Sequence, residues 1–181
     1  KENIFSVLNI LAPKNSELSI ELDNKYQHKN INGYENIRNN AKDEAYLFYE
    51  KISLSQFGKD QILNYFQSLK LSEFLKNEDS LLLPLFKAAE DHLSTYLKNQ
   101  GIEFGSSTDL SHLLNRLKDH INRSPNLSHF KSKWRREKGK FFRIVDVRNA
   151  TAHASAFDAS LIGPTQENVK KLLYFIEELR H

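Results

Sequence analysis

Cysteine and methionine are absent from this chain of 181 residues, and it has only six glycines and four prolines. Without cysteine the protein has no disulfide, no thiolate metal ligand and no thiol nucleophile. The scarcity of glycine and proline favours helices over a turn-rich β-sandwich. No apolar run approaches the length of a membrane span, and no signal-peptide pattern opens the chain. We therefore expect a cytoplasmic helical protein that does not enter a membrane.

The overall composition is that of a globular protein. Hydrophobic residues make up 39% of the chain, charged residues make up 27%, and the formal net charge is +3. This length suits one well-cored domain, or one domain with an appendage. The first residue is Lys1 rather than methionine. We therefore expect the chain to be a piece of a longer protein.

Apolar residues recur at helical spacing from residue 79 onward and predict four helices. The first would be capped by Asp79 and Ser80 and end at Gly101, and the second would be capped by Thr108 and end at Ser124 and Pro125. A third covers the region around 128–153, and the last starts at Gly163 and Pro164. Short connections between them indicate an antiparallel four- to five-helix bundle over 79–181.

Residues 1–78 are interpreted as an N-terminal extension or as part of a preceding domain. Leu18, Ile20 and Leu22 alternate with charged residues and predict one short strand. The segment Asn24 to Asn40 is rich in asparagine and is interpreted as a loop. From residue 40 onward the pattern becomes helical, over about 41–52 and 62–69, with Gly58 at the predicted break.

The charge is unevenly distributed. A cluster over 131–143 holds seven cations and only one acid, Glu137. Such a cluster attracts polyanions in a salt-dependent way, and Trp134 within it offers a ring for stacking on an unpaired base. The alternative is a solvated helix face with Trp134 turned into the core. The predicted RNA-binding residues are Lys131, Lys133, Trp134, Arg135, Arg136, Lys138, Lys140 and Arg143.

Arg148, Asn149 and His153 form a compact motif shortly after this cluster. Arginine binds phosphate oxygens through its planar, permanently charged guanidinium group, and histidine exchanges a proton near neutral pH. These two residue types are sufficient to break RNA without a metal. No phosphate-binding glycine loop and no metal-ligand spacing occurs in the sequence, so no cofactor and no metal site is predicted.

The Arg-Asn-x-x-x-His pattern of Arg148, Asn149 and His153, late in a third helix and followed by one more amphipathic helix, resembles the HEPN superfamily. The resemblance covers roughly 79–181. It implies an all-α bundle and, in many members, a metal-independent ribonuclease of toxin, abortive-infection or CRISPR-associated antiviral defence systems. It also implies an active site at a homodimer interface, and an antitoxin or regulatory domain as a further partner.

The helical positions of the motif bear on this interpretation. At about 100° per residue, Asn149 and His153 share a face, whereas Arg148 and His153 are separated by roughly 140°. One helix is therefore a poor site, and two copies of it related by a two-fold axis would be needed. In the resulting mechanism the ribose 2′-hydroxyl attacks the phosphorus and leaves a 2′,3′-cyclic phosphate. His153 acts as general acid or base, Arg148 stabilises the phosphate charge, and Asn149 bonds the phosphate or the imidazole.

Other interpretations stay open. In one of them His153 is a helix-end residue and Arg148 belongs to a surface ion pair, and some HEPN-like domains bind RNA or a partner protein without catalysis. A nucleotidyl-modified toxin is less favoured, because that branch carries a tyrosine after the histidine and 154–156 contain none. His92, beside Glu90 and Asp91, is interpreted as a surface residue, with a supporting role at the site as the alternative.

Overall fold

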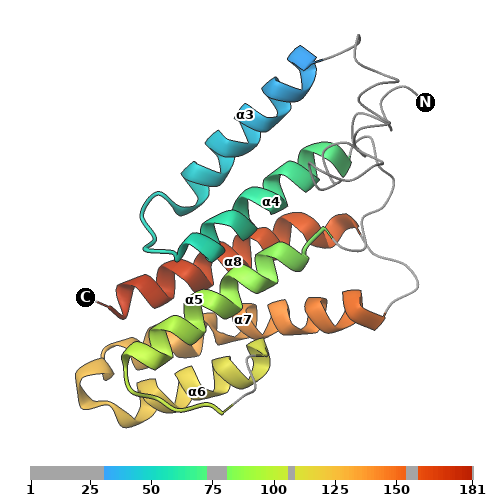
Figure 1. Ribbon diagram of the computed structural model, residues 1–181. Helices are drawn as coiled ribbons and strands as arrows, with labels where there is room; N and C mark the ends of the chain where they lie inside the picture. The colour runs from blue at the N-terminus through green and yellow to red at the C-terminus, as the bar shows by residue number, and fades with distance from the viewer. Residues whose placement is uncertain (1–30, 73–80, 106–108, 154–158, 181) are drawn as a thin grey trace.

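The computed structural model describes residues 31–72, 81–105, 109–153 and 159–180. These ranges contain α-helices, short 3-10 turns and no strand (Figure 1). The helices are α3 (Ile31–Tyr49), α4 (Gln56–Ser72), α5 (Leu83–Asn99), α6 (Leu110–Arg123), α7 (Phe130–His153) and α8 (Ile162–Glu178). The predicted all-α class is thereby confirmed for the described part of the chain.

The ends of α5 and α6 follow from local chemistry. Pro84 lies in the first turn of α5, where its missing N–H costs no helical hydrogen bond. At the other end Gly101 adopts a φ of 69°, the N–H of Ile102 donates to the carbonyl of Leu97, and the predicted stop at Gly101 is confirmed. The cap of α6 is Asp109, whose carboxylate accepts a hydrogen bond from the N–H of His112 at 3.0 Å.

Several predicted boundaries differ from the observed ones. The caps expected at Asp79, Ser80 and Thr108 lie outside the described residues, and Leu82 precedes α5 without a side-chain cap. The predicted strand over 18–22 also lies outside them. The predicted loop over 24–40 is wrong from Ile31 onward, because α3 begins there. The low content of apolar residues in that stretch gave no helical signal, and the buried residues described in α3 are Ala41, Ala45 and Phe48.

Gly58 does not break a helix, although the spacing predicts a break there. It lies in the first turn of α4, where the Oγ of Ser55 accepts a hydrogen bond from its N–H at 2.9 Å. A Cβ at this position would approach Oδ2 of Asp91 to 3.3 Å. Glycine is therefore placed here by the close approach of α4 to α5.

The helices are not all antiparallel. In α5 and α6, Glu90 lies beside the start of α6 at Leu110, and Tyr96 lies edge-on to His120 near the end of α6, so the two helices run in the same direction (Figure 1). The expectation of a wholly antiparallel bundle with short connections is wrong for this pair. Residues 100–109 connect the two helices. An extended connection of this length can reach roughly 30 Å, which exceeds the length of about 21 Å of α6, so the chain can return to the start of a parallel α6.

One hydrophobic core extends through the described helices. Ile62 and Tyr65 of α4 are buried in the same cluster as Leu85 of α5 and Leu172 of α8. Tyr65 also donates a hydrogen bond to the side chain of Gln166 at 2.9 Å. The core therefore continues across the predicted boundary between residues 78 and 79, and α3 and α4 enlarge the bundle.

Candidate active site at the end of α7

The motif residues lie in the last turns of α7, which is one continuous helix from Phe130 to His153. Arg148 faces α5, where its Nε lies 3.0 Å from Oε1 of Glu90. The side chain of Arg148 is 32% exposed, and that of Glu90 is 17% exposed. The pair is half-buried, so its attraction is screened by water less than that of a surface pair.

Several groups act on the carboxyl group of Glu90. Burial raises its pKa above the ordinary value, and Arg148 and a hydrogen bond from the backbone N–H of Leu110 offset only part of this rise. Leu110 begins α6, so the carboxylate also lies at the positive end of that helix. Oε1 has no aligned hydrogen bond among the described residues, so the contact with Arg148 is an ion pair. Glu90 thus orients Arg148 and joins α5, α6 and α7 at one point.

Of the two remaining motif residues, Asn149 has a described side chain, and it lies on a different side of α7 from Arg148. Asn149 is exposed to solvent on the outer side of α7. Thr151 donates from its hydroxyl to the carbonyl of Arg148 at 2.9 Å, within the last turn. His153 is the final residue of α7, and its side chain lies outside the described part of the structure. The structure therefore places the three residues on one helix end, with Arg148 and Asn149 on different sides of it.

The cations of the basic cluster divide into two groups. Lys133 pairs with Glu178 of α8, and Arg136 and Lys140 both pair with Glu137. These two bonds lower the pKa of the Glu137 carboxyl group. The others have no ion-pair partner among the described residues: Lys131, Arg135, Lys138 and Arg143. Because Lys131, Arg135 and Lys138 are spaced by four and three residues, they share one face of α7.

Trp134 is not available for stacking on a base. Its side chain is only 3% exposed and packs against Phe141 of α7 and Phe175 of α8, with ring centroids 5.8 and 5.9 Å away. The prediction that its ring binds RNA is therefore wrong, and the alternative of a core position is correct. An indole inside a charged run is still the largest apolar side chain available to fill the gap between two helices.

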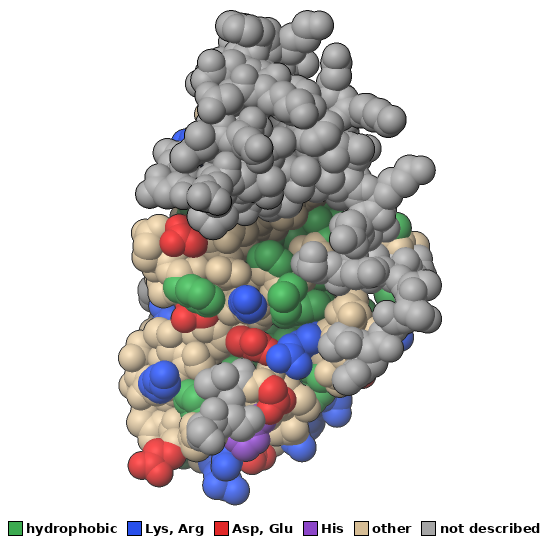
Figure 2. Space-filling model, turned by 45° about the vertical axis from the view of Figure 1, so that its right-hand side comes forward, with side chains coloured by type: hydrophobic (Ala, Val, Ile, Leu, Met, Phe, Trp, Pro, Cys, Tyr) green, Lys and Arg blue, Asp and Glu red, His purple; other side chains and the backbone are tan. Residues whose placement is uncertain are grey.

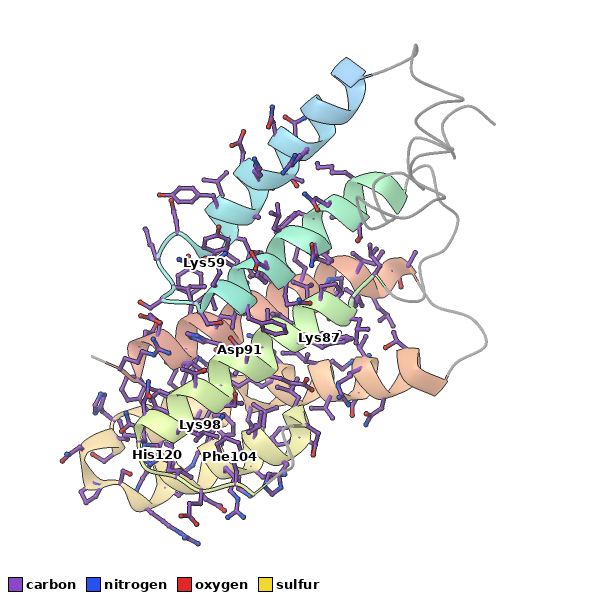
Figure 3. The ribbon with its side chains drawn as sticks, viewed as in Figure 1. Lys59, Lys87, Asp91, Lys98, Phe104 and His120 are labelled. Carbon is purple, nitrogen blue, oxygen red and sulfur yellow. The ribbon has the colours of Figure 1, made fainter. Side chains whose placement is uncertain are left out.

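A cleft opens beside the Arg148–Glu90 pair. It has a volume of about 310 Å³ and is lined by Phe57 of α4 and by Lys87, Glu90, Asp91 and Ser94 of α5. Lys87 and Asp91 both project from α5 (Figure 3). Because Glu90 belongs both to the ion pair and to the cleft wall, the two features are adjacent. The four α5 residues share one helix face because of their spacing, and Phe57 of α4 completes the cleft.

His92 is buried rather than exposed, contrary to the sequence interpretation. It is 1% exposed, and its Nε2 lies 3.7 Å from Oε2 of Glu177. Glu177 in turn accepts hydrogen bonds from the N–H and the hydroxyl of Ser53, and Arg180 lies 3.6 Å from its Oε2. Burial, aided by Arg180, lowers the pKa of His92 to about 4. The spacing Leu85, Ala88, His92 and Tyr96 was the available signal of an inward position.

The buried His92 makes stability depend on pH. Folding lowers its pKa from an ordinary value of 6.5 to about 4, so the unfolded chain binds a proton in this interval and the folded chain does not. The contribution is therefore fully present above pH 6.5 and decreases by about 3 kcal/mol as the pH falls toward 4. Urea titrations from pH 7 to pH 4.5 measure it, and His92→Gln flattens the curve whereas exposed His129→Gln does not. An unchanged slope in His92→Gln would contradict this assignment.

Comparison with protein-family models, with curated proteins and with solved structures gave no match to this chain. No helix within the described ranges is long and apolar enough to cross a membrane. Among the described residues, no three histidine, aspartate or glutamate side chains gather as a metal site would require. What the site can do must therefore be argued from its own side chains.

Proposed function

We propose that this protein is a metal-independent endoribonuclease with a HEPN-like active site formed by Arg148, Asn149 and His153. The observation that carries the proposal is the position of Arg148. This residue lies five residues before His153 near the end of α7, its side chain is partly exposed, and Glu90 orients it. The ion pair approaches Arg148 at Nε, so the four N–H donors of its two terminal nitrogens are left to serve a phosphate. An oriented arginine is better prepared for charge stabilisation than a freely rotating one.

In the proposed reaction the 2′-oxygen of a ribose forms a bond to the neighbouring phosphorus, and the bond from phosphorus to the 5′-oxygen breaks. One histidine takes the proton of the 2′-hydroxyl, and a second proton is delivered to the departing 5′-oxygen. Arg148 stabilises the charge on the nonbridging oxygens. The products are a 2′,3′-cyclic phosphate and a 5′-hydroxyl, and DNA is not cut because it lacks the attacking group.

Two acid–base groups are needed at once, and each chain supplies one His153. We therefore infer a homodimer in which the ends of two α7 helices meet. The divergence of Arg148 and Asn149 on α7 supports this, because their side chains cannot all converge within one copy. By analogy with the HEPN toxins and antiviral effectors that the motif resembles, we propose that this enzyme acts in the cytoplasm and is controlled by an antitoxin or a regulatory domain.

The direct test incubates the purified protein with an end-labelled RNA in excess EDTA and identifies the product ends. We expect cleavage that is unaffected by EDTA and products that carry 2′,3′-cyclic phosphates. Cleavage that requires an added divalent metal, or products with 5′-phosphates, would contradict the proposed mechanism. A DNA of the same sequence serves as the matched control and stays intact.

A second function, RNA binding without cleavage, is favoured by one observation. Lys131, Arg135 and Lys138 share one face of α7 and have no ion-pair partner among the described residues. In that case the same assay yields intact RNA, and the binding constant falls with rising salt, with a logarithmic slope of about 0.7 for each phosphate that the protein neutralises. Arg135→Glu with Lys138→Glu then reduces binding, whereas Lys133→Ala, which removes a cation already paired with Glu178, has little effect.

A further inference from the structure

The cleft between α4 and α5 has the dimensions and the walls of a site for one nucleobase. Its volume of about 310 Å³ is at the lower end of small-molecule sites. Figure 2 shows hydrophobic, acidic and basic side chains intermingled on one face of the molecule, and the cleft wall has the same mixture, with an aromatic ring, a cation and two carboxylates. A flat aromatic base with polar edges requires such mixed surroundings.

Phe57 supplies the apolar wall. It is 50% exposed although it belongs to a helix whose neighbours Ile62 and Tyr65 are fully buried. An aromatic ring at the mouth of a cleft offers a face on which an unpaired base of any identity can stack. Lys87, exposed on α5 at the same cleft, supplies a cation for the phosphate attached to that base.

The polar wall consists mainly of acceptors. Asp91 is held in place by the hydroxyl of Ser55, which donates to its Oδ2 at 2.5 Å, and the hydroxyl of Ser94 is turned to the carbonyl of Asp91 at 3.0 Å. Glu90 adds a second carboxylate to this wall, of which Oε1 is buried and pairs with Nε of Arg148 at 3.0 Å. Carboxylate oxygens accept from N–H groups and repel carbonyl oxygens.

We propose that this cleft binds a nucleobase of the RNA substrate that carries an exocyclic amino group, namely adenine, cytosine or guanine, and disfavours uracil. Uracil has no amino group and presents carbonyl oxygens on both sides of its single N–H. The inference rests on the proposed ribonuclease function, which it deepens by naming a base preference. Glu90 connects the two sites, because the carboxylate that orients Arg148 also forms the cleft wall.

The test titrates the full chain with the four 5′-mononucleotides, AMP, CMP, GMP and UMP, by calorimetry or by chemical-shift changes. We expect UMP to bind at least about tenfold more weakly than the other three. Phe57→Ala weakens binding of the amino-bearing nucleotides about tenfold, as loss of one stacked base predicts. Tyr46→Ala is the matched control, since Tyr46 is a similarly exposed aromatic residue, 59% accessible, on α3.

Asp91→Asn is the second variant, because asparagine keeps the size of the side chain and replaces one acceptor with a donor. It should reduce the preference against UMP, with helix content unchanged by circular dichroism. Equal binding of all four nucleotides, or shifts confined to α7, would overturn the proposal. Mononucleotides contain no bond for the enzyme to cut, so this failure is distinct from failure of RNA cleavage. Selective nucleotide binding without RNA cleavage would instead contradict the proposed ribonuclease function and support the proposed nucleobase site.

Discussion

If the proposed ribonuclease function holds, we expect His153→Ala to lose RNA cleavage by about 10²–10⁴-fold, the range for removal of one positioned acid–base group. The loss arises in the chemical step, so RNA binding measured by fluorescence anisotropy stays within a factor of about three, a bound set by the small contribution of one neutral side chain. The measurement is the initial rate on labelled RNA in EDTA. Because His153 ends α7, its replacement removes no interior helical hydrogen bond.

The controls for this variant separate chemistry from folding. His129→Ala removes an exposed histidine just before the start of α7 and keeps full activity. Light scattering shows whether His153→Ala still forms the dimer. We expect Arg148→Lys to lose activity as well, although lysine keeps the positive charge. Its ammonium group lacks the Nε that contacts Glu90 and the planar guanidinium that binds two phosphate oxygens at once. Equal rates for wild type and His153→Ala would refute the ribonuclease proposal.

Trp134→Ala lowers the free energy of unfolding by about 3–5 kcal/mol, the usual cost of truncating a large buried aromatic side chain. Trp134 is 3% exposed and lies among Phe141 and Phe175, so its removal opens a void between α7 and α8. Urea unfolding followed by circular dichroism measures the change. Trp134→Phe is destabilised less, because a smaller ring still fills part of the space.

The neighbour Arg135 provides the matched control for this second prediction. Arg135 is an exposed residue of α7, and Arg135→Ala changes the free energy of unfolding by less than about 0.5 kcal/mol. Under the proposed function we also expect only Arg135→Ala to weaken RNA binding, since only the arginine offers a charge to phosphate. A Trp134→Ala protein of unchanged stability that bound RNA more weakly would show that the indole contacts a base.

Much of the helical layout was predictable from spacing alone. The apolar stripe Leu110, Leu113, Leu114, Leu117 and Ile121 is fully buried in α6, as its periodicity predicted. Gly101 ends α5 because a left-handed residue is required there, and Ser124 follows α6 directly before Pro125. Such signals are local, since the residues that determine them lie within one or two turns of each other.

Spacing was less informative where chain direction or partner identity mattered. Nothing in residues 100–109 specifies that the chain returns along α5, so the parallel course of α5 and α6 came only from their packing. Likewise, Trp134 and His92 each sit among charged neighbours in the sequence, and their burial depends on Phe175 and Glu177 of a distant helix. A hydrophobic pattern shows which face is apolar, but not which partner covers it.

The Arg148–His153 region shows the same division. The amino-acid order alone determined that Arg148, Asn149 and His153 lie on one helix near its end, because five residues of α-helix fix their relative angles. Tertiary structure decided that Arg148 meets Glu90 of α5 at the start of α6, and that Phe57 of α4 closes a cleft beside them. These contacts join residues that are far apart in the chain, and only the burial of a shared core brings such residues together.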